Sequence, residues 1–275
     1  MKIYLMTDME AVAGILNFED WCTPSSRYYE LGKEFVTLEA NAAVEGFFAG
    51  GATCVTVADG HGHGALNPKL LDPRAELMRG WPEGFPFLLD SSYDAIAWVG
   101  QHAKAGTEYS HLTHTQGFSY IDLAVNGISI GEFGQMALCA AELGVPVIFA
   151  AGEEAFAKEV KALTAWAETV SVKRGVTPGR GEELTTQQYS RRNLGAVHLS
   201  PERARSLIRA GTERAAQRLQ RERFDLVPLK APFERVARFR PEKEGDPITT
   251  SRETHPSSVI ALLNMKFNPR PESAR

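Results

Sequence analysis

The sequence has few cysteines and no long apolar run. Its three cysteines, Cys22, Cys54 and Cys139, are an odd number without CxxC spacing, which argues against a disulfide framework and against a thiolate zinc site. The start of the chain, MKIYLMTDME, holds an apolar stretch that is too short for a secretion signal or a membrane span. We therefore expect a cytoplasmic protein with no membrane partner.

The sequence also has no excess of basic over acidic residues. The formal net charge is −4 and the pI is about 6.0, so there is no electrostatic reason to expect a nucleic-acid partner. The most basic stretch, residues 203–224, follows the helix-starting pair Ser200-Pro201 and interleaves Glu with Arg, as a solvated helix does. No GxxxxGK[ST], GxGxxG, GxSxG or HExxH motif is present, which excludes the common phosphate loops, the hydrolase elbow and the zincin helix.

What the chain does contain is a set of short apolar runs, at residues 2–7, 54–58, 95–100 and 145–151. They are continuous rather than alternating in polarity, as parallel strands covered on both faces are. Apolar residues at helical spacing lie between the first two runs, and a helix over residues 132–143 precedes the fourth. The pattern predicts an α/β fold of three αβα layers around a mostly parallel sheet.

After residue 170 the signals weaken. We expect one unit over residues 1–275, with an α/β core at 1–170 and a smaller α+β portion at 171–275. The long segment 64–90, rich in Leu, Pro, Gly and aromatic residues, is predicted to cross the surface.

Acidic and imidazole side chains follow the predicted strands. Since ligands bind at the carboxyl ends of parallel strands, these residues are predicted to share one site. Carboxylates and imidazoles are zinc ligands, and one carboxylate could bridge two metals about 3.5–4 Å apart, although one metal with further acids nearby is an alternative. Single acids after strands are commonly caps and turn formers, but their convergence favours a metal site. The residues after the strands are Asp8, Glu10, Asp59, His61 and His102, and Glu132 opens the helix before the fourth strand.

Other histidines and acids lie close to these positions. In VADGHGHG, residues 57–64, we expect His61 to be a ligand and His63 to be exposed or behind the site, with glycines allowing a sharp turn. His114 is a candidate general base or oxyanion partner, whereas His111 is predicted to lie at the surface. Glu153 and the following Glu154 are predicted to begin a helix. Asp8 and Glu10, two apart on a strand, are expected to point the same way.

Five motifs together resemble the D-aminopeptidase family of the bacterial dipeptide-transport operon, whose members are zinc peptidases. They are TDMEAVAG, VADGHGHG, VGQHAKAGT, LTHT and GEFGQMALCAAELGVPVIFAAGEE, and they cover roughly the first 155 residues in the family's order. A looser similarity continues to about Phe224. Two positions depart from the usual pattern, Ala11 where glycine is more common and Gly60 where a small hydroxyl residue is. Neither departure removes a ligand.

The resemblance implies two zinc ions per subunit, a catalytic histidine at His114 and a homo-oligomeric ring, a decamer in known cases. Asp8 would bridge the two ions. The implied ligands are Asp8, Glu10, His61, His102 and Glu132.

We therefore expect a zinc-dependent aminopeptidase that hydrolyses short peptides with an N-terminal D-residue, D-alanine being favoured. His114 would act as general base, with a nucleophilic role as the alternative, and Asp59 would orient His61 or bind the substrate amine. One rival is a two-metal hydrolase of another amide or ester. A second rival is a non-catalytic, metal-dependent peptide-binding protein, against which the presence of His114 argues.

Overall fold

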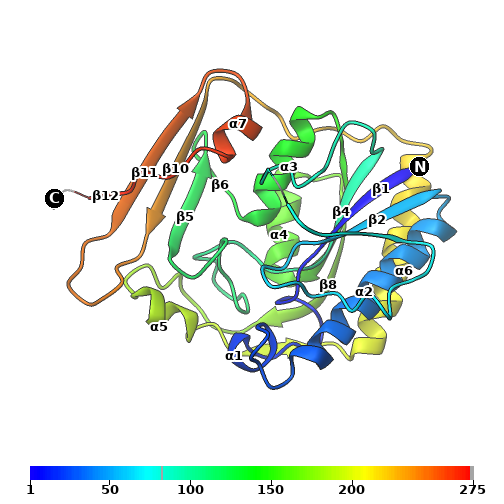
Figure 1. Ribbon diagram of the computed structural model, residues 1–275, viewed down its shortest axis with the longest axis horizontal. Helices are drawn as coiled ribbons and strands as arrows, with labels where there is room; N and C mark the ends of the chain where they lie inside the picture. The colour runs from blue at the N-terminus through cyan, green and yellow to red at the C-terminus, as the bar shows by residue number, and fades with distance from the viewer. Residues whose placement is uncertain (82, 273–275) are drawn as a thin grey trace.

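The computed structural model describes residues 1–81 and 83–272. Strands and helices alternate through the first half of the chain (Figure 1). In chain order the elements are β1 Lys2–Thr7, α1 Phe18–Trp21, α2 Tyr29–Ala49, β2 Cys54–Asp59, β3 Glu76–Met78, β4 Ala95–Gln101, β5 Tyr120–Val125, β6 Ile128–Ser129, α3 Glu132–Glu142, β7 Val147–Glu153, α4 Glu154–Leu163, β8 Glu168–Gly175, α5 Thr186–Ser190, β9 Ala196–His198, α6 Pro201–Leu219, β10 Phe233–Phe239, β11 Thr249–His255, α7 Val259–Leu263 and β12 Arg270–Pro271.

A seven-stranded sheet with the order β3-β2-β1-β4-β7-β8-β9 forms the centre of the molecule. All neighbouring strands are parallel except β8 and β9. Strands β1 and β2 are paired without a shift, from Lys2 opposite Cys54 to Thr7 opposite Asp59, so both end at the same edge. The residues that follow them, including the predicted ligands, are therefore brought together by the register of the sheet.

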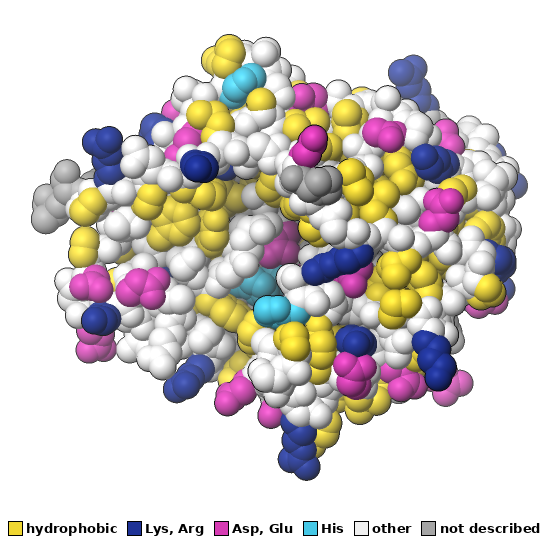
Figure 2. Space-filling view, in the orientation of Figure 1, with side chains coloured by type: hydrophobic (Ala, Val, Ile, Leu, Met, Phe, Trp, Pro, Cys, Tyr) yellow, Lys and Arg dark blue, Asp and Glu magenta, His cyan; other side chains and the backbone are white. Residues whose placement is uncertain are grey.

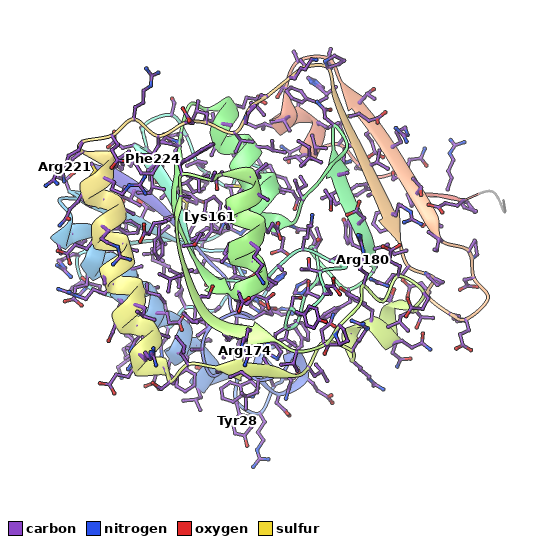
Figure 3. All side chains as sticks on the ribbon, turned by 180° about the vertical axis from the view of Figure 1, so that it is seen from behind. Tyr28, Lys161, Arg174, Arg180, Arg221 and Phe224 are labelled. Atoms are coloured by element: carbon purple, nitrogen blue, oxygen red, sulfur yellow. The ribbon has the colours of Figure 1, made fainter. Side chains whose placement is uncertain are left out.

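Helices cover both faces of this sheet, which confirms the predicted three layers. Helices α2 and α6 lie on one face and α3 and α4 on the other, as Figure 1 and the reverse view in Figure 3 both show. Within β1, Ile3 and Leu5 pack into the core under α2 and α6, whereas Tyr4 and Met6 pack into the core under α3. In the described part of the chain, no helix combines the length and apolar character that crossing a membrane requires.

A second, antiparallel sheet with the order β12-β11-β10-β5-β6 packs beyond α3 and α7. Its β5–β6 hairpin turns at Asn126 and Gly127, both with positive φ, which is typical of an Asn-Gly turn. This sheet supplies the expected smaller portion, but the boundary at residue 170 requires correction. The β5–β6 hairpin lies before that residue and joins the second sheet, because β5 pairs with β10. Strand β8 spans the residue, β9 and α6 lie after it, and both strands join the first sheet.

The turn after β1 rests directly on β4. The amide of Asp8 donates to the Val99 carbonyl (3.0 Å) and the amide of Ala11 donates to the Gly100 carbonyl (2.9 Å). Gly100 has a φ of +78°, and a Cβ at this position would lie 2.1 Å from the Asp8 carbonyl oxygen. Only glycine allows the two backbones to approach so closely.

Gly100→Ala is therefore expected to destabilise the protein by more than about 2 kcal/mol and to displace the turn that carries Asp8 and Glu10. Gly144→Ala is a matched control, because Gly144 has the same φ of +78° with open space around it. It should cost about 1 kcal/mol from backbone strain alone. Urea unfolding of both variants measures the difference, and equal losses would show that the close approach to Asp8 has no separate cost.

Candidate metal centre

A cavity of about 420 Å³ opens at the carboxyl edge of the large sheet. Figure 2 shows it as a hollow near the centre of that face, with histidine and carboxylate side chains inside and hydrophobic side chains around it. Five of the predicted residues line it, namely Asp8, Glu10, His61, His114 and Glu132. The predicted convergence of strand-end residues is thus present.

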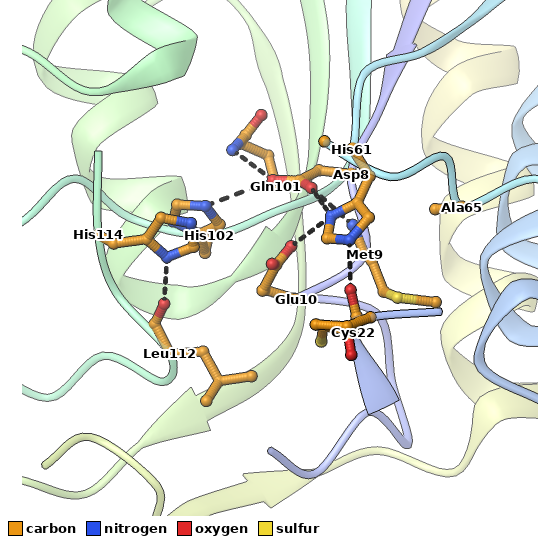
Figure 4. Close-up of polar contacts among 12 residues, drawn as sticks. Asp8, Met9, Glu10, Cys22, His61, Ala65, Gln101, His102, Leu112 and His114 are labelled. Atoms are coloured by element: carbon orange, nitrogen blue, oxygen red, sulfur yellow. Dashed lines mark hydrogen bonds and ion pairs between the residues drawn. The ribbon is translucent and has the colours of Figure 1, made fainter. Parts of the chain in front are cut away.

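Asp8, Glu10 and His61 form the first of two groups whose ligand atoms lie within 4.8 Å of one another. The His61 Nδ1 atom is 3.2 Å from Asp8 Oδ1 and 3.3 Å from Glu10 Oε2 (Figure 4). The other ring nitrogen, Nε2, donates to the Cys22 carbonyl at 2.8 Å, so Nδ1 is the nitrogen that faces the two carboxylates. Strand β1 ends at Thr7, so Asp8 and Glu10 meet through a turn and not, as expected, through the alternation of a strand.

His102, His114 and Glu132 form the second group. The Nε2 atoms of His102 and His114 lie 3.7 Å and 3.9 Å from Glu132 Oε1, and the two rings stack with centroids 3.9 Å apart. Each Nδ1 donates to a backbone carbonyl, His102 to Ala103 at 2.9 Å and His114 to Leu112 at 2.7 Å. Both rings therefore direct Nε2 toward the carboxylates.

Asp8 connects the two groups. Its Oδ1 lies 3.2 Å from His61 Nδ1 and its Oδ2 lies 3.4 Å from His102 Nε2. A residue that sequence reasoning missed, Gln101, donates from Nε2 to Asp8 Oδ2 (2.8 Å) and to Glu132 Oε2 (3.1 Å). Its position at the end of β4, directly before His102, was the available signal. One carboxylate oxygen facing each group is the arrangement that a bridging ligand needs.

The donor atoms of this cluster fit a divalent cation such as zinc. Glu10 Oε2 and His102 Nε2 are buried and have no hydrogen-bond partner among the described residues. Burial, together with the Glu10 carboxylate, raises the pKa of Asp8 to about 7, since the carboxylates repel one another. Although burial favours a neutral ring, the Glu10 and Asp8 carboxylates raise the pKa of His61 to about 12. The cluster thus stabilises positive charge, and oxygen and imidazole donors suit zinc.

Asp59 has a different role from either of those expected. Its Oδ1 and Oδ2 accept hydrogen bonds from the amides of Ala65 (2.8 Å) and Leu66 (3.4 Å), and it does not line the cavity. It is thus placed neither to bind the substrate amine nor to orient the His61 ring. It holds the loop that carries His61.

The VADGHGHG loop separates its two histidines as predicted, with His61 buried and His63 exposed. Its glycines differ from expectation. A Cβ at Gly60 would lie 2.5 Å from Met6 Sδ and 2.7 Å from the Thr7 carbonyl oxygen, whereas Gly62 has open space. Gly60 is required for close packing against β1, and the positive φ of the loop falls at Gly64.

A layer of buried polar groups supports the ligand segments from behind. The Glu153 carboxylate accepts from the amides of Ala103 (2.9 Å) and His111 (2.6 Å), so it joins the segments that carry His102 and His114. Lys173 Nζ donates to the Glu10 carbonyl. His111, expected at the surface, is fully buried and donates from Nε2 to the Leu16 carbonyl at 3.1 Å. This contact fixes the path of the chain before His114.

Comparisons with known proteins agree with this geometry. Residues 1–255 match peptidase family M55, described as D-aminopeptidase. The D-aminopeptidase of Bacillus subtilis (strain 168) is 31% identical over 180 residues, which cover 64% of this chain and 65% of the relative, slightly less than two thirds of its length. The fold resembles a structure described as "Zn-dependent D-aminopeptidase DppA from Bacillus subtilis, a self-compartmentalizing protease", with a TM-score of 0.80, 24% identity, and coverage of 96% of this chain and 95% of the other.

Acid should destabilise the protein partly through His111. Burial lowers the pKa of His111 to about 2, with the Lys173 charge adding to the effect, whereas the unfolded chain takes up this proton near pH 6.5. Below about pH 6.5 the unfolded state therefore binds a proton that the native state does not, at a cost approaching 1.4 kcal/mol per pH unit. The midpoint of urea unfolding should therefore fall less between about pH 6.5 and about pH 4.5 in the His111→Gln variant than it does in the wild type. Parallel acid losses in the two proteins would contradict this origin.

Proposed function

Because the chain belongs to the D-aminopeptidase family over residues 1–255, we propose that it is a zinc-dependent aminopeptidase that releases an N-terminal D-residue, preferentially D-alanine, from short peptides. One observation carries the proposal beyond the family assignment. Asp8 presents one oxygen to His61 and the other to His102, so one carboxylate serves two groups of ligands.

The residues that would hold two zinc ions follow from these contacts. Asp8, Glu10 and His61 would form one site, and Asp8, His102 and Glu132 the other, with Asp8 as the bridge. When bound, zinc would supply Lewis acidity to the scissile carbonyl and to an attacking water. Gln101, which donates to both Asp8 and Glu132, would keep these two carboxylates in position.

His114 is the proposed general base. It lines the cavity, and its Nδ1 is occupied by the Leu112 carbonyl, so Nε2 is the atom that can accept a proton. Burial and the neighbouring His102 ring lower the pKa of His114, which keeps the ring neutral and ready to accept a proton at neutral pH.

We further propose that residues 1–275 act as one unit within a homo-oligomeric ring, a decamer by family resemblance. The self-compartmentalizing protease of similar fold supports assembly into an enclosed chamber. The proposed compartment is the cytoplasm, which the free thiols of Cys22, Cys54 and Cys139 favour. No contact or residue of the site favours hydrolysis of another amide or ester, or peptide binding without turnover.

The zinc-loaded protein is expected to release D-alanine from D-Ala-D-Ala, to lose this activity to a chelator and to regain it with zinc. His114→Ala should lower kcat by about 10²–10⁴-fold while zinc remains bound, because a positioned general base contributes about that much. A panel of D- and L-dipeptides and simple esters, assayed by product chromatography, tests the proposal. Turnover of esters alone, or binding without turnover, would support one of the rival functions instead.

The two histidines of the VADGHGHG loop should differ in metal content. Wild type and His63→Ala are expected to hold about two zinc ions per subunit, and His61→Ala about one or fewer, because only His61 faces Asp8 and Glu10. Elemental analysis after gel filtration in metal-free buffer gives the stoichiometry. An equal loss of zinc from both variants would mean that His61 acts through the loop and not as a ligand.

A further inference from the structure

We propose that Arg79 binds the C-terminal carboxylate of the substrate, which makes short zwitterionic peptides, dipeptides above all, the preferred class. The inference rests on the proposed aminopeptidase function and assigns a residue outside the metal centre. It also gives a role to the segment 64–90, which from sequence alone is only an excursion across the surface.

Arg79 carries a positive charge that the protein leaves largely uncompensated. Its Nη1 donates to the carbonyls of Asp59 (2.6 Å) and His61 (2.7 Å), and its Nη2 donates to that of Gly62 (2.8 Å). These acceptors are neutral. The Asp59 carboxylate is 3.9 Å away and already accepts two backbone hydrogen bonds, from Ala65 and Leu66.

The guanidinium group is fixed but not saturated. Three carbonyls hold it in one orientation, while Nε has no partner among the described residues. Arg79 lines the cavity, and it is the one Lys or Arg among the described residues that do so. A guanidinium held rigidly with free N–H groups is well suited to a carboxylate, because little conformational entropy is lost on binding.

Arg79 and the metal centre are connected through a single residue, His61. The guanidinium contacts the backbone oxygen of His61, and the ring of that same residue contacts Asp8 and Glu10. In a dipeptide, the scissile carbonyl and the terminal carboxylate are also separated by one residue, about 3.8 Å between successive Cα atoms. A longer peptide would carry its carboxylate past Arg79.

The charges of the cavity would orient such a substrate. A dipeptide near neutral pH has a protonated amine and an ionised carboxylate. The three carboxylates at the metal end would be compensated by the zinc ions, whereas Arg79 carries a positive charge away from them in the same cavity. With the scissile bond at the metal centre, the terminal carboxylate of the peptide would lie toward Arg79.

Aromatic side chains adjoin Arg79 in the same cavity. Trp81, Phe85 and Phe87 all line it, with ring centroids 5.4 Å apart for Trp81 and Phe87 and 4.6 Å for Phe85 and Phe87. Apolar walls lower the local dielectric and strengthen an ion pair with the guanidinium. They also give the side chain of the second residue an apolar surface to contact.

The test compares D-Ala-D-Ala with its C-terminal amide, which lacks only the negative charge. Wild type should have a kcat/KM for the acid about ten-fold above that for the amide. In Arg79→Met this ratio should fall to near one, and in Arg79→Lys it should be intermediate. Arg74→Met is the matched control, since Arg74 is an exposed arginine paired with Asp72 outside the cavity, and it should keep the wild-type ratio.

The ratio of kcat/KM for the acid to kcat/KM for the amide distinguishes recognition of the carboxylate by Arg79 from a purely structural role of Arg79 in the His61 loop. A loss of loop geometry would lower both substrates equally, and an unchanged ratio in Arg79→Met would overturn the inference. Calorimetric titration of the His114→Ala protein with the acid and with the amide gives a second readout without turnover. About ten-fold tighter binding of the acid, abolished by adding Arg79→Met, is expected, and equal binding of both ligands would overturn the inference even if no peptide is hydrolysed.

Discussion

Repulsion among the buried carboxylates at the edge of the large sheet is the constraint on which the site depends. The carboxylates of Asp8, Glu10 and Glu132 lie close together in the folded protein. Burial and the repulsion between these charges raise the pKa of Asp8 to about 7. Such a group is stable only when positive charge lies among the oxygens. The imidazoles of His61 and His102 lie at those points, and a ring nitrogen of each faces the carboxylates.

The parallel sheet makes this concentration of charge possible. Strand β1 pairs in parallel with both β2 and β4, so the three strands end at the same edge of the sheet. The turns that follow these strands therefore lie close together. The turns cannot hold themselves there against repulsion. Gly100 lets the Asp8 turn lie on β4, Asp59 and Arg79 tie the His61 loop, and Glu153 ties the segments of His102 and His114. Each link is a backbone contact, which fixes the main chain and leaves the ligand side chains free.

The cavity joins two kinds of chemistry. One end is a cluster of acids and imidazoles, and the remaining walls include Arg79 and the aromatic residues of the segment that follows it. The ligand types at the first end are those that suit a divalent cation such as zinc. The second end belongs to the segment 64–90, whose described residues form no helix and no strand apart from β3. Loops of this kind vary more freely than the core. The proposed role of Arg79 would place a determinant of substrate preference in this segment.

The sequence by itself determined the layers of the fold and most members of the site. Continuous apolar runs predict buried parallel strands, and polar residues directly after them predict a shared edge, because strand direction alone brings those positions together. Asp8, Glu10, His61, His102, His114 and Glu132 were all found in this way or by resemblance, and the structure brings them together.

Only the tertiary structure decided the contacts between segments far apart in the chain. Three features depend on packing partners 50 or more residues away or on the path of a loop. They are the pairing of β5 with β10 rather than with the large sheet, the direction of Asp59 toward its own loop rather than the cavity, and the burial of His111. Gln101 and Arg79 are ordinary residues in the sequence, and only their distances to the carboxylates and carbonyls around them show a role. The local sequence pattern indicates which face of a strand or helix a side chain occupies. Its hydrogen-bond partners depend on which loops come together in the folded protein.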